Sequence, residues 1–166
     1  DGVNDAVEQS VTLDVNDLDE RSPVISSAIT VDNIDENSGA GKVIYIATAD
    51  DSFDFSAGVT FSLAESSDAG LSINSSTGEV TLIDNPDADT KEEFSFTIVA
   101  SDAVNEDDEI SLTLNVNDLD DTAAIITSGE TADTIDENSG SGQVIYTATA
   151  DDSADVSDGV TFSLAA

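Results

Sequence analysis

Oxygen-bearing side chains gather in a short motif that occurs twice in this chain of 166 residues. Asn16-Asp17-Leu18-Asp19 returns 101 residues later as Asn117-Asp118-Leu119-Asp120. Hard cations such as Ca²⁺ take about six to eight oxygens from carboxylates, Asn side chains and backbone carbonyls. One such motif is weak evidence, because Asp and Asn are ordinary turn residues. Its return at a fixed distance makes a metal site the stronger interpretation.

The motif belongs to a longer internal repeat. When the chain is displaced by 101 residues, 41 of the 65 overlapping positions are identical without a gap. Such a period is typical of an array of like domains, here about 101 residues each. We therefore expect three parts: residues 1–21, the end of a repeat with its linker; residues 22–121, a complete repeat; and residues 122–166, the start of the next. Because the chain begins at Asp1 rather than Met and stops inside a repeat, we expect a longer parent polypeptide.

The charge balance restricts the partners. Against 37 acidic residues the chain has only Arg21, Lys42 and Lys91, a formal net charge of −34. Such a surface repels nucleic acid and anionic lipid and attracts cations. Either bound divalent ions or a salt-adapted, screened surface would relieve the self-repulsion, and the two explanations are compatible. No apolar run is long enough for membrane insertion, and no signal peptide is visible.

Apolar and polar residues alternate through the complete repeat, which indicates half-buried strands rather than disorder. The alternation predicts seven short strands. The first covers Pro23–Val31, and the others contain the rows Val43/Tyr45/Ala47/Ala49, Val59/Phe61/Leu63, Leu71/Ile73, Val80/Leu82, Phe94/Phe96/Ile98/Ala100 and Ile110/Leu112/Leu114/Val116. No segment has a convincing helical period. The expected fold is all-β, a seven-strand Greek-key (Ig-like) β-sandwich in tandem repeats.

Further carboxylates stand at strand ends and turns of this sandwich. Glu36 lies in an Ile-Asp-Glu-Asn turn, Asp50-Asp51 closes the second strand, and Asp102 ends the sixth. Asp87 and Asp89 flank Ala88 before the sixth strand. We leave four other acidic residues as solvated turn residues: Asp54, Asp107, Asp108 and Asp155.

These motifs together resemble those of the cadherin family, and specifically its bacterial cadherin-like relatives. The likeness spans the complete repeat and both partial repeats. The matching motifs are the linker Asp14-Val15-Asn16-Asp17, the turn Glu36-Asn37, Ala49-Asp50-Asp51, Thr77-Gly78, Asp87-Ala88-Asp89 and Ala100-Ser101-Asp102. Leu18 and Leu119 stand where the family's linker has Asn, and Asn115 stands where it has Asp.

The resemblance implies a cadherin-like sandwich with its termini at opposite ends, and junctions between repeats that bind Ca²⁺ and form a stiff rod. At the first junction the implied ligands are Asp14, Asn16, Asp17, Asp19, Asp50, Asp51 and Asp102. At the second junction they are Glu36, Asp87, Asp89, Asn117, Asp118, Asp120, Asp151 and Asp152. We expect the first site to be the weaker one, because the preceding repeat's Glu and Asp-x-Asp are missing. Without cations, the crowded carboxylates should raise one another's pKa.

Two functions remain open. The first is a calcium-stiffened extender repeat of a large extracellular, surface-attached or secreted bacterial adhesin or filament. The alternative is a recognition module that binds glycan or another copy of itself; Phe53 and Phe55 are candidates, but Ala154 and Val156 replace them one period later. We expect no enzyme, because the chain has no His and no Cys and almost no Lys or Arg.

The partial repeats raise a question of partners. Residues 1–21 carry only a last strand, with Val11, Leu13 and Val15 on one face, and residues 122–166 carry about the first three strands. Neither can close a sandwich alone. Adjacent repeats of the same polypeptide are the expected partners. A second hypothesis is head-to-tail self-association, in which the leading strand of one chain is added to the trailing segment of another.

Overall fold

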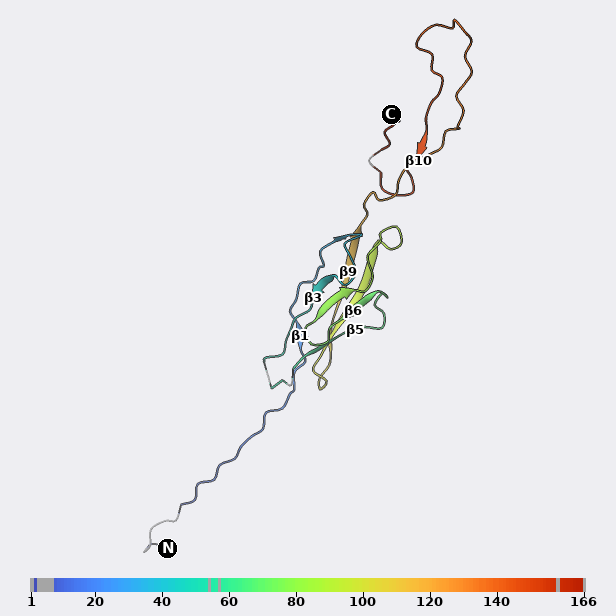
Figure 1. Ribbon diagram of the computed structural model, residues 1–166. Helices are drawn as coiled ribbons and strands as arrows, with labels where there is room; N and C mark the ends of the chain where they lie inside the picture. Colours follow the sequence, from blue (N-terminus) through green and yellow to red (C-terminus); the bar gives the residue numbers. More distant parts are fainter. Residues whose placement is uncertain (1, 3–7, 54, 57, 158, 166) are drawn as a thin grey trace.

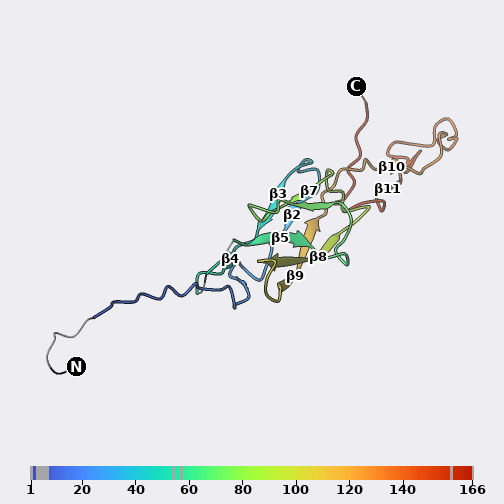
Figure 2. The same cartoon turned by 90° about the horizontal axis from the view of Figure 1, so that it is seen from below.

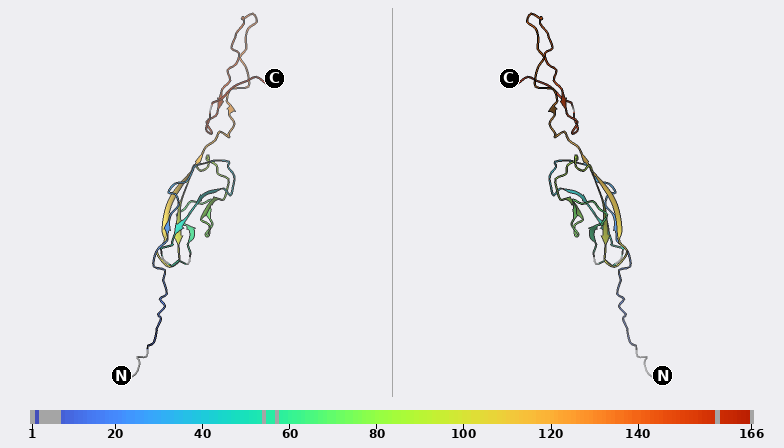
Figure 3. Two further views of the ribbon diagram at one scale, coloured as in Figure 1. Left: turned by 90° about the vertical axis from the view of Figure 1, so that its left-hand side faces the viewer. Right: turned by 90° about the vertical axis from the view of Figure 1, so that its right-hand side faces the viewer.

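The computed structural model describes residues 2, 8–53, 55–56, 58–157 and 159–165. All regular elements among these residues are β-strands. None of these residues forms a helix long and apolar enough to cross a membrane. The molecule is elongated: residues 8–21 lead into one end of a folded body, and residues from 122 onward leave at the opposite end (Figure 1, Figure 3). The junctions lie at these two ends.

Two sheets face each other in the complete repeat (Figure 2). One is four-stranded, in the order β2 (Ile34–Asp35), β9 (Asp108–Asn117), β8 (Glu93–Ser101), β5 (Thr60–Leu63). The other is three-stranded, in the order β3 (Val43–Ile46), β7 (Glu79–Leu82), β6 (Leu71–Ile73). All pairs are antiparallel except β2 with β9, which is parallel. The predicted all-β sandwich is confirmed.

The core lies between the sheets and is formed by every second residue of the long strands. Ile98 of β8 and Leu114 of β9 are fully buried, and Val80 of β7 is fully buried opposite them. Successive side chains of a strand point to opposite faces, so one face of each sheet is apolar and the other carries Ser, Thr and Glu. The inward rows predicted for β5, β8 and β9 are confirmed; Val59, Leu63, Phe94 and Ile110 are half-buried and the other members are buried.

The first strand differs from the prediction. Instead of one strand over Pro23–Val31 there are two short ones: β1 (Val24–Ile25), which pairs with β4 (Ala49–Asp50), and β2, which lies beyond Val31. Because β2 pairs with β9 in the four-stranded sheet, this segment has hydrogen-bonding partners in two places. A single continuous strand cannot satisfy both sets of partners. The prediction of one strand was therefore wrong, although its start after buried Pro23 was right.

The second strand is also interrupted. The pairing of β3 with β7 shifts register between Val43 and Tyr45, so Val43 is 45% exposed while Tyr45 and Ala47 are buried. The predicted shared face of Val43 and Tyr45 was therefore wrong, because a β-bulge moves one residue to the other face. At Ala47 the chain passes Gly78, whose φ is +70° and whose missing Cβ would lie 2.3 Å from the Ala47 oxygen. Only glycine fits at this close approach.

The trailing segment keeps the first pairing of the repeat. Its strands β10 (Ile125–Ile126) and β11 (Ala150–Asp151) pair in the same register as β1 and β4. The Tyr146 hydroxyl donates to Ser128 Oγ at 2.7 Å, as Tyr45 does to Ser27 Oγ at 2.8 Å. The predicted further strands are not formed among the described residues of this segment, nor in residues 8–20. In the trailing segment the pairing partners would be counterparts of β7, β8 and β9, and for residues 8–20 they would be counterparts of β2 and β8; the segments lack these partners.

Candidate metal centres

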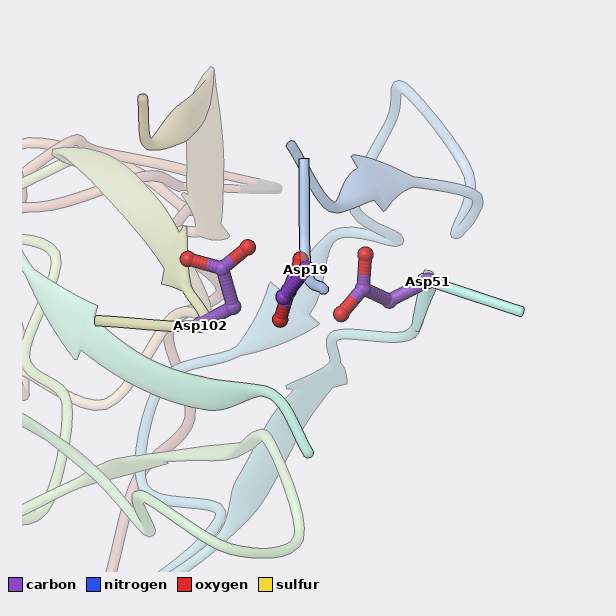
Figure 4. A group of neighbouring side chains, drawn as sticks. All are labelled: Asp19, Asp51 and Asp102. Atoms are coloured by element: carbon purple, nitrogen blue, oxygen red, sulfur yellow. The ribbon is translucent and has the colours of Figure 1, made fainter. Parts of the chain in front are cut away.

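Three carboxylates meet at the first junction. Asp19 of the linker, Asp51 after β4 and Asp102 after β8 each offer an oxygen, and these oxygens lie within 4.8 Å of one another. Figure 4 shows the three side chains grouped where the linker meets the loops. All three are among the residues predicted from the sequence. The sandwich brings them together because the ends of β4 and β8 face the incoming linker.

Asp102 is held firmly in this group. Asp102 is only 5% exposed, and its Oδ1 accepts the backbone N–H groups of Val104 and Asn105, both at 2.8 Å. Oδ2 accepts the Asn105 side-chain amide at 2.9 Å. The Asn105 amide and these backbone donors hold the pKa of Asp102 below its ordinary value, against the opposing effect of burial. Asp102 is therefore an ionised carboxylate in a fixed position and a candidate ligand.

Asp51 and Asp50 have different environments although they are adjacent. Asp51 accepts the Ser56 hydroxyl and points into the cluster. Asp50 accepts the Ser52 N–H at 3.0 Å, and the side-chain and backbone hydrogen bonds from Ser52 lower its pKa. Asp50 thus caps the turn after β4 and stays outside the cluster. Asp14 and Asp17, two exposed linker residues predicted as ligands, also lie outside the cluster, and the predicted ligand Asn16 is exposed. Asp54 lies outside the described residues.

A second cluster lies at the opposite end of the repeat. Asp89 from the β7–β8 loop, Asp121 from the linker and Asp155 after β11 offer oxygens within 4.8 Å of one another. Asp155 Oδ2 also accepts the backbone N–H groups of Asp121 at 2.8 Å and Thr122 at 2.9 Å. The trailing segment is thereby attached to the linker. Only Asp89 of these three was predicted as a ligand, and the interpretation of Asp155 as a merely solvated turn residue was wrong.

A signal for the two missed residues was present in the repeat. Asp155 corresponds to Asp54 and Asp121 to Glu20, so both positions are acidic in each copy. Sequence reasoning favoured the shorter Asp-Asp spacing instead. Asp151 accepts the Ser153 N–H at 3.0 Å, and hydrogen bonds from Ser153 lower the pKa of Asp151. Asp152 accepts the Ser157 hydroxyl. Neither belongs to the described cluster.

Glu36 ties together the elements that carry the second cluster. It is 3% exposed, and its Oε2 accepts the Ala88 N–H at 2.8 Å while Oε1 accepts the Leu119 N–H at 2.7 Å. Its own N–H donates to the Asn117 carbonyl at 3.0 Å. One buried carboxylate thus holds the β7–β8 loop and the linker side by side. Asp89 and Asp121, which follow these contacts in each segment, are close for this reason.

Carboxylates at the second junction perturb one another. Loss of hydration together with the negative charges of Asp155, Glu36 and Asp89 raises the pKa of Asp118 to about 6, and a hydrogen bond with Asp155 adds to the shift. Desolvation, followed by the charge of Asp155, also raises the pKa of Asp89. The pKa of Asp155 itself is lowered, chiefly by the Asp121 N–H. The expected rise in pKa among crowded carboxylates is confirmed for Asp118 and Asp89.

Four remaining residues have hydrogen-bond partners outside the two clusters or lie at the surface. Asp87 accepts the Thr90 N–H at 3.1 Å and the Thr90 hydroxyl at 3.0 Å. The Asn117 amide donates to Asp35 Oδ1 at 2.9 Å. Asp120 is exposed. Asp108 Oδ2 accepts the Ile25 N–H at 2.8 Å, which joins β1 to the start of β9, so the interpretation of Asp108 as a solvated turn residue was wrong.

Comparison with known proteins identifies the fold. No protein-family model matches the chain, and no curated protein matches it. Among solved structures, protocadherin gammaB7 EC3–6, in a cis-dimer structure, has a TM-score of 0.69 at 23% identity and covers 89% of this chain and 39% of its own. Human protocadherin-24 EC1–2 has a TM-score of 0.63 at 22% identity, and the match covers 77% of this chain and 58% of the protocadherin chain. Mouse cadherin-23 EC22–24 has a TM-score of 0.60 at 20% identity, and the match covers 81% of this chain and 44% of the cadherin-23 chain. This chain spans less than two thirds of each of these proteins, and it has the fold of cadherin extracellular domains.

Proposed function

We propose that this chain is a calcium-stiffened extender segment of a large extracellular bacterial adhesin or surface filament. The observation that carries the proposal is the convergence of a linker carboxylate with carboxylates of the adjoining loops at each end of the complete repeat. The bacterial and extracellular setting is supported by the sequence resemblance alone. Near-identical tandem copies suit a spacer, because adding units lengthens it without a new design.

The donor chemistry fits Ca²⁺. Both clusters offer only oxygen atoms, and the chain has neither His nor Cys for softer metals. Asp19, Asp51 and Asp102 would hold an ion at the first junction; Asp89, Asp121 and Asp155, beside Asp118, would hold one at the second. A bound ion supplies the positive charge that these carboxylates lack. The other predicted ligands remain predictions for sites completed by neighbouring repeats.

Rigidity follows from which segments the carboxylates join. At the second junction the ligands come from the complete repeat, the linker and the trailing segment, so an ion there would restrain all three together. Without an ion, the same groups repel across the linker. We propose no catalytic role, since the clusters lie at seams between repeats and the usual acid–base and nucleophilic side chains are scarce.

A calcium titration tests this function. We would measure thermal melts and isothermal titration calorimetry with CaCl₂, using EDTA and NaCl of matched ionic strength as controls. We expect a calcium-specific rise in melting temperature and binding on the order of 10⁻⁴–10⁻³ M, as for other extracellular modules. Asp121→Asn with Asp155→Asn should abolish the second site, whereas Asp133→Asn, an exposed change in the trailing segment, should not. Equal stabilisation by NaCl would contradict specific calcium sites and would mean that the acidic residues form a salt-adapted surface.

The exposed aromatic residues favour a second function, recognition of a neutral glycan. Phe53 is 75% exposed and Phe55 is also exposed, on the loop that follows Asp51. Aromatic faces can stack on apolar faces of sugars. Phe53→Ala, which copies the residue of the next repeat, should remove binding in a glycan array if this loop is the site. Unchanged binding, or none in the wild-type chain, would eliminate it.

Self-association by strand addition is supported by two complementary surfaces. Val11, Leu13 and Val15 are exposed, and the trailing segment has a hollow lined by Ile126, Tyr146, Ala148, Phe162 and Leu164. In the complete repeat, the counterparts of this lining belong to the hydrophobic core or pack against it, and that core includes residues of β8 and β9. We propose that residues 8–18 of a second copy cover the hollow. Sedimentation across a dilution series should show dimers that Leu13→Asp removes; a monomer at every concentration would overturn the idea.

A further inference from the structure

One nitrogen atom at the first junction contacts three oxygens. The side-chain Nδ2 of Asn105 lies 2.7 Å from Asp19 Oδ1, 2.9 Å from Asp102 Oδ2 and 3.0 Å from the Arg21 carbonyl. Two of the acceptors belong to the linker and one to the turn after β8. Two of them are carboxylates of the candidate metal centre. A single amide thus bridges the parts that a cation would join.

The turn that carries Asn105 is fixed in shape. The Asn105 backbone N–H is bound to Asp102 Oδ1, and Ala103 between them has φ +68°, in the left-handed region. The amide therefore stands at a set distance from Asp102. The Asp and Asn of this turn recur one period earlier in the sequence, where Asp1-Gly2-Val3-Asn4 corresponds to Asp102-Ala103-Val104-Asn105. The three residues that follow the Asn differ between the two copies.

The three oxygens decide which end of the amide faces them. Carboxylate and carbonyl oxygens accept hydrogen bonds, so they attract the NH₂ group and repel the amide oxygen. A calcium ion reverses the preference, because it binds oxygen at about 2.3–2.6 Å. Exchanging the two ends requires only a half-turn about the Cβ–Cγ bond, with no movement of the backbone.

We propose that the Asn105 amide is a cation surrogate and switch at the first junction. In calcium-free protein its NH₂ group holds the Asp19, Arg21 and Asp102 oxygens together. When calcium binds, the amide turns and presents Oδ1 to the ion. This inference rests on the proposed calcium function and assigns to it a residue outside the predicted ligands. It also explains how the first junction keeps its arrangement between binding events.

The test uses the full chain and one isosteric substitution. Asn105→Asp replaces the donor by a carboxylate, so the calcium-free protein should melt at a lower temperature, and the first site should bind calcium about tenfold more tightly, because added ligand charge raises affinity. Asn138→Asp, an exposed change in the trailing segment, adds the same charge away from this junction and is the matched control. Identical behaviour of the two variants would overturn the switch.

A second measurement does not depend on any variant folding. In ¹⁵N-labelled wild-type protein, the Asn105 side-chain NH₂ signals should move during a calcium titration and lose the shift that reflects hydrogen bonding to carboxylates. If calorimetry shows calcium binding while these signals stay in place, the switch is wrong and the proposed function stands. If calorimetry shows no calcium binding, the proposed function fails and the switch fails with it.

Discussion

The two junctions of this chain share a linker motif but differ in electrostatics. At the first, amide and N–H donors surround the carboxylate of Asp102 and lower its pKa. At the second, carboxylates face carboxylates, and the pKa values of Asp89 and Asp118 are raised. A junction whose charges already have donors can keep its arrangement without a cation. A junction whose charges oppose one another needs either protons or a cation to stay closed.

The difference begins in how each linker meets the repeat. At the first junction the linker contributes Asp19, whose counterpart at the second is Asp120. The second cluster instead uses Asp121, one residue further along. Asp155 explains the change, because it binds the Asp121 and Thr122 N–H groups and so draws this part of the linker inward. Identical motifs therefore do not guarantee identical ligand sets.

The largest effect should come from the buried anchor of the second junction. Glu36→Ala removes the acceptor of the Ala88 and Leu119 N–H groups, and losing two charge-assisted hydrogen bonds should cost about 2–4 kcal/mol of unfolding free energy. Chemical denaturation without calcium measures this. The control is Glu137→Ala, the exposed counterpart one period later, where we expect almost no change. Equal losses of unfolding free energy in both variants would contradict a stabilising role that is specific to the buried Glu36.

A smaller effect, on both stability and calcium affinity, is expected at Asp155. Asp155→Asn keeps an oxygen for the Asp121 and Thr122 N–H groups but removes one negative charge. Without calcium the junction should be less stable, because an amide oxygen accepts weaker hydrogen bonds than the carboxylate, whose pKa these N–H groups lower. With calcium, affinity at the second site should fall by roughly tenfold, since ligand charge sets affinity. Calorimetry against Asp51→Asn, which should weaken only the first site, would show whether the junctions are independent.

The smallest effect is a pH dependence that separates the two junctions. Asp118 has its pKa raised from 3.8 to about 6, so the folded state binds its proton more tightly than the unfolded chain does. Its stabilising contribution is therefore present below about pH 4 and is lost as the pH rises through about 6. Asp102 has a lowered pKa, so its contribution is present above the ordinary value and is lost only in stronger acid.

Carboxyl ¹³C chemical shifts in calcium-free protein would follow both groups. We expect Asp118 to titrate near pH 6 and Asp102 below its ordinary range. Calcium should displace the Asp118 proton, so affinity at the second site should increase from about pH 5 to pH 7. An Asp118 that titrates at its ordinary value would contradict the carboxylate crowding described for this junction.

How far the fold could be predicted depended on strand length. Long strands such as β8 and β9 carry four inward residues each, so their alternation identified them with their correct faces. The division of the first strand into β1 and β2 was not predictable, because two-residue strands are set by partners distant in sequence. The bulge at Val43 was not predictable either, because a prediction from alternation assumes that the strand pairs in an unbroken register.

The candidate site was partly predictable because several of its carboxylates lie directly after a strand or in the linker motif. Asp19, Asp51, Asp102 and Asp89 were identified from motif and position, and the structure places them in the two clusters. Asp155 was missed because it lies on a loop whose course the strand pattern does not determine. Asn105 was missed because an amide three residues beyond a strand-end Asp resembles an ordinary turn residue.

The most direct test of a calcium-stiffened junction is the distance across the second junction with and without calcium. Because the chain has no Cys, Glu65→Cys with Ser141→Cys allows spin labels at only these two exposed positions, one in the complete repeat and one in the trailing segment. Pulsed electron spin resonance should give a broad distance distribution in EDTA and a narrow one in millimolar CaCl₂. A distribution that stays broad in calcium, or narrows equally in NaCl of the same ionic strength, would contradict a calcium-stiffened junction.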